Sequence, residues 1–135
     1  MTLSITVNLP VKDVARSSAF FAHLGFVINP LYANEEHMEL LGISDEVNVM
    51  LVSESRFKPM TGKDIADATH EAEAVMQLCV ESRERVDELV VKALAAGGLP
   101  LHETNDQGFL YGRSFQDLDR HNWDAFYVDE TAMPS

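Results

Sequence analysis

The chain has 135 residues, of which 46% are hydrophobic and 24% are charged, and its formal net charge is −12 at pH 7. This length and composition are typical of one folded domain with a sizeable core, and they exclude an intrinsically disordered chain. Nucleic-acid-binding proteins present clustered Lys and Arg, so 22 acidic against 10 basic residues argue against nucleic acid as a partner.

The amino-terminal residues lack the basic start and long apolar core of a signal peptide. No apolar run reaches the roughly 20 residues that a membrane-spanning helix needs. We therefore expect a cytoplasmic protein that does not enter a membrane. Cys79, the single cysteine, lies in an apolar run, and we expect it to be buried as a small hydrophobic side chain.

The first half of the chain predicts the order strand, helix, strand, strand, strand. Residues 4–11 alternate between apolar and polar side chains, which is typical of a strand. A helix is expected over residues 14–24, with Asp13 as its N-cap and Gly25 as its stop. Three further strands are expected over residues 26–33, 37–43 and 46–53.

The second half repeats this order. A strand is expected over residues 74–80, followed by Ser82 as the cap of a helix over residues 83–96 and by Gly97-Gly98 as its end. Helical spacing places five apolar side chains on one stripe of this helix: Val86, Leu89, Val90, Ala93 and Leu94. Strands then follow near residues 99–104, 109–116 and 121–128, and the aspartates of "DLDR" favour a turn between the last two.

An internal duplication of a βαβββ unit describes this pattern best. We expect an α+β fold in a single domain, residues 1–135, with a first module at 4–53 and a second at 74–130. Residues 54–73 are expected to form a bridging loop that could contain a short helical turn. Two unrelated α+β halves are the weaker alternative.

The two ends of the chain carry distinctive motifs, "NLPVKDVARSSAFFAHLGF" and "YGRSFQDLDRHNWDAFYVD". They resemble the opening strand and helix and the closing hairpin of the vicinal oxygen chelate superfamily, which includes glyoxalase I, bleomycin-resistance proteins and extradiol dioxygenases. The resemblance implies an eight-stranded mixed sheet, four strands from each module, curled around a cavity with the helices outside. It also implies a homodimer, and it leaves open whether the cavity forms within one chain or between two.

In the metal-using members, the resemblance implies ligands from the first and last strands of each module. The matching positions here are Thr6, Val75, Val49 or Met50, and Asp124, and only Asp124 carries a carboxylate. A single carboxylate holds a divalent ion weakly. We therefore expect no metal and no other cofactor, with a divalent ion held partly by Asp124 as the alternative. None of the five histidines has a short metal-binding spacing.

Side chains two residues apart on a strand share a face. If Thr6 and Asp124 face the cavity, Asn8 and Phe126 should face it too, and the duplication adds Gln77 from the second module. Asn8 and Gln77 are equivalent primary amides that could orient a polar ligand, or that could hydrogen-bond to backbone edges instead.

Four further residues are candidates for the ligand pocket. Tyr111 and Arg113 share one strand face, and Arg113 could pair with Asp124, bind an anionic ligand or lie at the surface. Phe57 and Met60, in the bridge, could form an apolar lid or a dimer contact. Trp123 and Tyr127 fall on the face opposite Asp124, so we expect them under a helix in the core.

These residues predict a glyoxalase- or bleomycin-resistance-like protein that binds a small organic molecule in a metal-free cavity. A metal-dependent lyase, isomerase or dioxygenase of the same superfamily is the alternative, and a dimerisation module is a weaker third. No nucleophile and base stand at an interpretable spacing, so the sequence assigns no catalytic residue and leaves open whether the chain is an enzyme.

Overall fold

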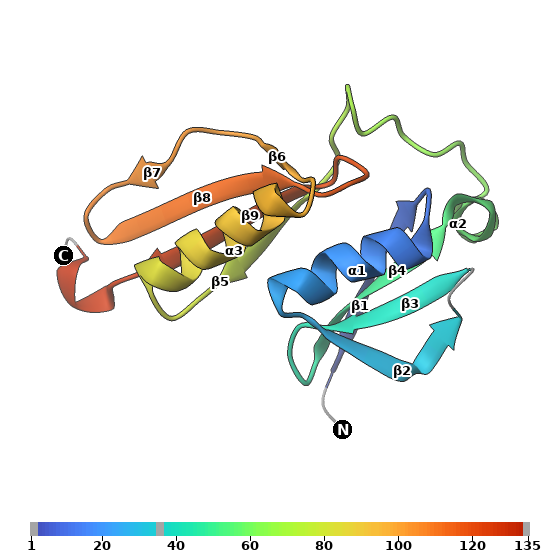
Figure 1. Cartoon of the computed structure of the whole chain (residues 1–135), viewed down its shortest axis with the longest axis horizontal. Coiled ribbons are helices and arrows are strands. Elements are labelled where there is room, and N and C mark those ends of the chain that lie inside the picture. Colours follow the sequence, from blue (N-terminus) through green and yellow to red (C-terminus); the bar gives the residue numbers. More distant parts are fainter. Residues whose placement is uncertain (1–2, 35–36, 134–135) are drawn as a thin grey trace. The chain divides into compact units, whose positions relative to one another are not determined.

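The computed structural model describes residues 3–34 and 37–133. The chain divides into two compact units, Met1–Asp67 and Ala68–Ser135, and each unit contains a mixed β-sheet with a long helix packed on one face (Figure 1). The α+β class and the two tandem modules with their helices outside are therefore confirmed, and the strands of the described residues form two mixed sheets, of four and five strands, in place of one eight-stranded sheet. That both modules form a single domain stays a prediction.

The first unit contains a four-stranded sheet in the order β1-β4-β3-β2. Its strands are β1 (Ile5–Val11), β2 (Val27–Asn34), β3 (Met38–Gly42) and β4 (Val47–Ser53). The neighbours β1 and β4 run parallel, and the other pairs are antiparallel. The helix α1 (Val14–Leu24) packs on this sheet, and the bridge contributes a second helix, α2 (Glu54–Thr61).

The long helices begin and end as the sequence predicts. The Asp13 carboxylate accepts a hydrogen bond from the Arg16 amide at 3.0 Å, and the Ser82 hydroxyl accepts one from the Arg85 amide at 3.1 Å. Each cap satisfies a backbone N–H that has no partner within its helix. Gly25 ends α1 with φ 102°, a left-handed conformation that glycine adopts without steric cost.

The second unit repeats the arrangement with one additional strand. Its helix is α3 (Arg83–Ala95), and its sheet has the order β5-β9-β8-β6, with β7 also paired to β8. The strands are β5 (Val75–Cys79), β6 (Leu99–Pro100), β7 (Asn105–Asp106), β8 (Leu110–Gln116) and β9 (Asn122–Val128). A short 3₁₀ helix, Glu130–Ala132, follows β9.

Of the strand predicted near 99–104, only β6 is formed, and β7 lies just beyond its end, because this edge carries two residues more than β8. Pro100 pairs with Phe115 and Asn105 with Gly112, so a step of five residues lies opposite a step of three. Between these pairs the His102 amide donates to the Ser114 hydroxyl at 2.9 Å instead of to a backbone carbonyl. The extra residues form a bulge, which the alternation of side chains could not reveal.

Each long helix covers one face of its sheet and leaves the other face uncovered by it. In the second unit, Phe115 and Trp123 are fully buried and stack at 6.2 Å on the side of α3, as predicted for Trp123. The residues that alternate with the core positions along each strand face the uncovered side of the sheet. Cys79 faces this uncovered side and is exposed, so the expectation of a buried cysteine is wrong.

Asp117 organises the turn between β8 and β9. Its carboxylate is fully buried and accepts three N–H groups: the Asp119 and His121 amides at 2.9 and 3.0 Å and Trp123 Nε1 at 3.0 Å. Burial raises the pKa of Asp117, while the charge of His121 and the hydrogen bonds oppose the shift. The aspartate turn predicted from "DLDR" therefore also holds the indole of the largest core residue.

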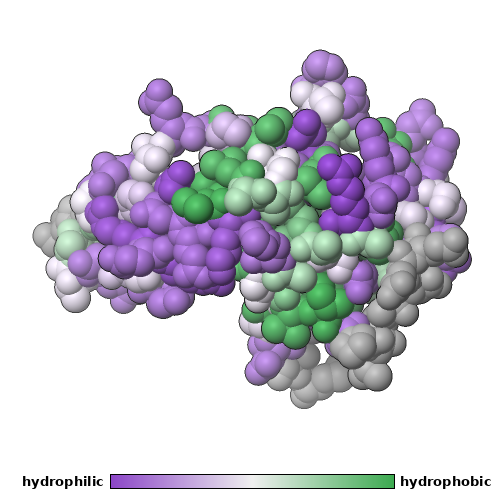
Figure 2. All heavy atoms as spheres, viewed as in Figure 1, coloured by the Kyte–Doolittle hydropathy of each residue, from purple (hydrophilic) through white to green (hydrophobic). Residues whose placement is uncertain are grey.

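The outer surface of α3 is strongly polar. Figure 2 shows hydrophilic residues gathered over this helix, where Glu88 accepts hydrogen bonds from Arg85 at 3.1 Å and from Lys92 at 2.9 Å. Among the described residues, no helix combines the length and the apolar character that crossing a membrane requires.

Replacing Asp117 by Asn should destabilise the protein by about 2 kcal/mol. The amide must turn its NH₂ group toward one of the N–H donors, which leaves a buried donor without an acceptor. Urea unfolding of Asp117→Asn, Trp123→Phe and the double variant measures the coupling between the two side chains. Additive effects of the two substitutions would contradict the role of the Trp123–Asp117 hydrogen bond.

Candidate functional site: a pocket on the uncovered face of the second sheet

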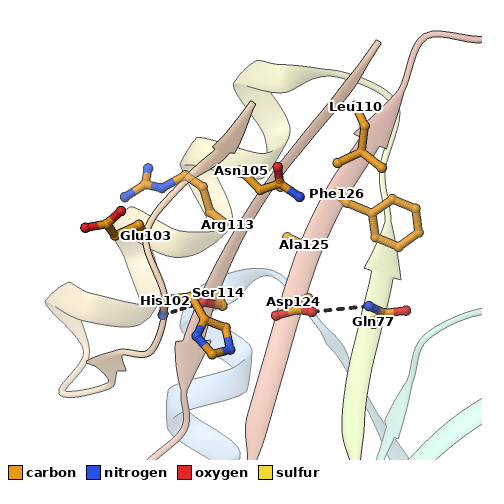
Figure 3. A pocket seen from close by; sticks show the side chains of 11 residues that line it. Gln77, His102, Glu103, Asn105, Leu110, Arg113, Ser114, Asp124, Ala125 and Phe126 are labelled. Atoms are coloured by element: carbon orange, nitrogen blue, oxygen red, sulfur yellow. Dashed lines mark hydrogen bonds between the residues drawn. The ribbon is translucent and has the colours of Figure 1, made fainter. Parts of the chain in front are cut away.

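A pocket of about 310 Å³ lies on the face of the second sheet that α3 leaves uncovered (Figure 3). Its floor comes from β5, β8 and β9, and its rim from the bulge between β6 and β7. The residues that line it are Gln77, His102, Glu103, Asn105, Leu110, Gly112, Arg113, Ser114, Asp124, Ala125 and Phe126.

A hydrogen bond between Gln77 and Asp124 lies at the centre of the floor. These residues are direct partners on the parallel strands β5 and β9, and Gln77 Nε2 donates to Asp124 Oδ2 at 3.2 Å. Figure 3 shows the two side chains end to end, with the Phe126 ring beside them. The pair leaves Asp124 Oδ1 and the Gln77 carbonyl as acceptors and one amide hydrogen as a donor.

Apolar surface lies next to these polar groups. Phe126 stands two residues beyond Asp124 on the same face of β9, and its direct partner on β8 is Gly112. A Cβ at Gly112 would meet no atom closer than 3.6 Å, the Phe126 Cβ. The absence of a side chain at Gly112 therefore opens space in the floor and is not required by backbone geometry.

The bulge supplies the rim. The hydrogen bond from the His102 amide to Ser114 holds it against β8, and Ser114 itself is buried. His102 and Glu103 follow on the bulged segment and line the pocket. Bulges commonly redirect side chains beside binding sites, and this one adds a carboxylate and an imidazole to a floor that already contains Asp124.

The other face of the same strands holds a separate polar network. Tyr111 Oη donates to Asp87 of α3 at 2.6 Å, and Arg113 Nη1 donates to the same Asp87 oxygen at 2.9 Å. The Tyr111 hydrogen bond, together with Arg113, lowers the pKa of Asp87, and the same bond raises the pKa of Tyr111. Arg113 lines one edge of the pocket, but its guanidinium pairs with Asp87 and not with Asp124.

Arg83 connects α3 to the rim. Its guanidinium donates to both oxygens of Asp106 at 2.9 Å and to the Gly108 carbonyl at 2.9 Å, and its Cζ lies 4.8 Å from the Tyr111 ring centroid. Bidentate pairing of this kind fixes orientation as well as distance. The first turn of α3 therefore positions β7 and the end of the bulge.

Two of the four predicted site residues of the first unit line a different pocket. Asn8 and Met60 line a pocket of about 380 Å³ that is formed by residues of this unit alone. Thr6 is exposed on β1, and Phe57 is half-buried on α2, and neither lines that pocket. Each amide of the predicted pair thus lies beside a pocket in its own unit.

Comparisons with known proteins agree with this architecture. The family model of the bleomycin resistance protein-like N-terminal region matches residues 4–37. A hypothetical protein from S. aureus of known structure is 31% identical, with a TM-score of 0.79 and coverage of 95% of each chain. Comparison with curated proteins gives no match.

Two further solved structures carry descriptive names. A glyoxalase/bleomycin resistance protein/dioxygenase family enzyme from Burkholderia phytofirmans is 19% identical, covers 91% of this chain and 96% of its own, and has a TM-score of 0.76. A glyoxalase-related enzyme from Fulvimarina pelagi is 16% identical, covers 94% and 88%, and has a TM-score of 0.78. Residues 4–37 thus match the bleomycin resistance protein-like family model, and the whole chain has the fold of the glyoxalase/bleomycin resistance protein/dioxygenase structures. The fold is shared with these enzymes, and a shared fold does not transfer their chemistry.

The metal site that the vicinal oxygen chelate resemblance implies does not fit the residues present. The register places Met50 opposite Asn8 as it places Asp124 opposite Gln77, so the duplicated counterpart of Asp124 is a thioether. At the ligand positions of the two first strands, Thr6 offers only a hydroxyl and Val75 offers no donor atom. Across residues 3–34 and 37–133, no three His, Cys, Asp or Glu side chains come together as a metal site would need.

Sequence reasoning predicted part of the pocket, Asp124 from the vicinal oxygen chelate resemblance, Phe126 from strand alternation and Gln77 from the internal duplication. Gln77, Asp124 and Phe126 line it, while Tyr111 lies on the α3 side of the sheet. Sequence reasoning missed Gly112, Ser114 and the rim residues His102 and Glu103. Gly112 and Ser114 could have been inferred from alternation opposite Asp124, but the rim depends on the bulge, for which the sequence contains no marker.

The Asp106 carboxyl should titrate with a pKa of about 2, because the Arg83 hydrogen bonds and the Gly108 amide favour its ionised form. A carboxyl whose pKa falls on folding stabilises the native state above its unfolded value of 3.8, and this contribution is lost as pH falls toward about 2. Carboxyl-carbon NMR titration of the wild type and Arg83→Gln measures this directly. An unchanged Asp106 titration in Arg83→Gln would contradict the pairing.

Proposed function

We propose that this protein binds a small organic molecule in the second-unit pocket without a metal ion. The observation that carries the proposal is the Gln77–Asp124 pair, which presents a carboxylate and an amide beside the Phe126 ring. A pocket that combines apolar surface with a few polar groups in fixed positions is the usual form of a small-molecule site.

The polarity of the pocket favours ligands that donate hydrogen bonds. Asp124 and Glu103 bring two carboxylates to the lining, and Arg113 is the one Lys or Arg among the lining residues. The Arg113 guanidinium donates to Asp87, so the two acids face no unpaired Lys or Arg of the lining, and His102 is the one imidazole beside them. An amine or hydroxyl group next to an aromatic or aliphatic body therefore complements the site.

The donor set supports metal-free binding over the alternative of a metal-dependent lyase, isomerase or dioxygenase. Asp124 is the single family position with a carboxylate, and it already accepts a hydrogen bond from Gln77. Tight binding of a divalent ion needs several convergent ligands, and no group of three His, Cys, Asp or Glu side chains accompanies Asp124 among the described residues. Homodimer assembly and a cytoplasmic location stay predictions for this protein.

Titration with phenethylamine tests the ligand class. Binding should shift the NMR signals of the Gln77 side-chain amide and the Gly112 backbone amide, because both adjoin the pocket floor. Asp124→Asn should weaken binding about tenfold, since a hydrogen bond to a charged group contributes about 1.5–3 kcal/mol. Gly112→Val should weaken it too by filling the floor.

Glu81→Gln is the matched control, because Glu81 is an exposed acid of the same unit outside the pocket and its loss changes the net charge equally. Its affinity for the amine should equal that of the wild type. Equal weakening of amine binding by Glu81→Gln and Asp124→Asn would show that overall charge causes the loss of affinity, and it would contradict the proposal.

The metal content of the purified protein distinguishes metal-free ligand binding from a metal-dependent enzyme. Untagged protein from cells grown with added Ni, Zn, Fe and Mn should contain far less than one ion per chain by elemental mass spectrometry. Asp124→Ala should leave that content unchanged. One equivalent of a transition metal in the wild type, lost in Asp124→Ala, would instead support the metal-dependent enzyme.

A further inference from the structure

The first unit contains a pocket of opposite polarity, which the function proposed above does not use. It has a volume of about 380 Å³ and lies between the face of the first sheet that α1 leaves uncovered and the helix α2. Its side chains come only from residues 8–60 of one unit, so its geometry is independent of the second-unit pocket.

Register explains the floor of this pocket. Asn8 on β1 is the direct partner of Met50 on β4, and Met38 on β3 is the direct partner of Val52 on β4. Met50 and Val52 stand two residues apart, so all four side chains share one face. The floor is therefore apolar and rich in thioethers, with a single primary amide at one side.

Helical spacing explains the roof. Arg56, Pro59 and Met60 stand at positions i, i+3 and i+4 of α2, which places them on one face of the helix, and all three line the pocket. Gly62 ends the helix with φ 70°, and its amide donates to the Lys58 carbonyl at 2.9 Å. The short helix thus presents one cation and one more thioether to the floor.

Arg56 is an available cation in an acidic protein. Its guanidinium makes no hydrogen bond or ion pair within residues 3–34 and 37–133, whereas the neighbouring Lys58 pairs with Asp64 at 3.2 Å. No Asp or Glu lines this pocket. The Asn8 amide makes one long hydrogen bond, 3.5 Å to the Thr6 carbonyl, and retains a second N–H.

We propose that this first-unit pocket binds a small organic anion with a flat apolar body. Arg56 holds the carboxylate or phosphate group through its planar fork of donors, and Asn8 donates a further hydrogen bond to the same group or to the body. The thioethers of Met38, Met50 and Met60 pack against the body, since methionine adapts to irregular shapes and contacts aromatic rings favourably.

Methionine-methyl NMR on the full chain tests this proposal with naphthoate as the probe. The chain has six methionines, of which Met38, Met50 and Met60 line the pocket. Naphthoate should shift these three methyl signals in one saturable curve, while Met76 and Met133, in the second unit, stay unchanged. Absence of saturable shifts at the three pocket methyls, or equal shifts at all five, would overturn the proposal.

Charge variants identify the head-group contact. Arg56→Gln should weaken naphthoate about tenfold through loss of the charge-assisted hydrogen bonds, with an unchanged melting temperature, because Arg56 is exposed. Arg16→Gln, an exposed arginine on α1 of the same unit, should bind as the wild type does. An Arg56→Gln variant with wild-type affinity would overturn the proposal.

Two more probes define the ligand chemistry. Naphthyl phosphate in place of naphthoate distinguishes a phosphate from a carboxylate head group by which of the two binds more tightly. Naphthylmethylamine should not bind, and equal binding of this amine would overturn the requirement for an anion. None of these outcomes depends on Asp124, so the failure of this inference is distinguishable from failure of the second-unit proposal.

Discussion

Burial of apolar side chains between one long helix and one face of a sheet determines where every other side chain of each unit lies. In the second unit Val86, Leu89, Val90 and Ala93 of α3 are at most 2% exposed and pack on the face that contains Phe115 and Trp123. Full burial of a Val or Leu side chain contributes about 1.5–3 kcal/mol, so this interface outweighs any single polar contact of the unit. Because strands alternate, the residues between these core positions are forced onto the other face.

How much a polar interaction adds to the stability of this arrangement depends on how deeply it is buried. The Asp117 carboxylate accepts three N–H groups in the core and holds the turn and the indole together. Surface pairs such as Lys92–Glu88 contribute little, because water and salt screen exposed charges. Between these extremes, Arg83 and Asp87 connect α3 to β7 and β8, and so they fix the edge of the sheet that carries the bulge.

The two units share the arrangement of strands and long helix, but their pockets differ in polarity. Each has an amide on the uncovered face of its first strand, Asn8 or Gln77, and each amide lies beside a pocket. The direct partner of Gln77 is the carboxylate of Asp124, whereas the direct partner of Asn8 is the thioether of Met50. Divergence at this register position places a carboxylate in one floor and a thioether in the other, while Glu103 on the bulge and Arg56 on α2 add to the opposite charge of the two pockets. The thioether also removes one of the paired donors that a metal ion would need.

The sequence by itself determined the order of the elements, the helix caps at Asp13 and Ser82 and the core position of Trp123, because these depend on local hydrogen bonding and on periodicity. It also placed Gln77, Asp124 and Phe126 on one face, because alternation is a local property of a strand. Only the tertiary structure decided that Cys79 is exposed, that Arg113 pairs with Asp87 and that His102 and Glu103 form a rim. The physical reason is the same in each case: these features depend on which face a helix covers and on a two-residue excess between paired strands, and both are relations between segments distant in sequence.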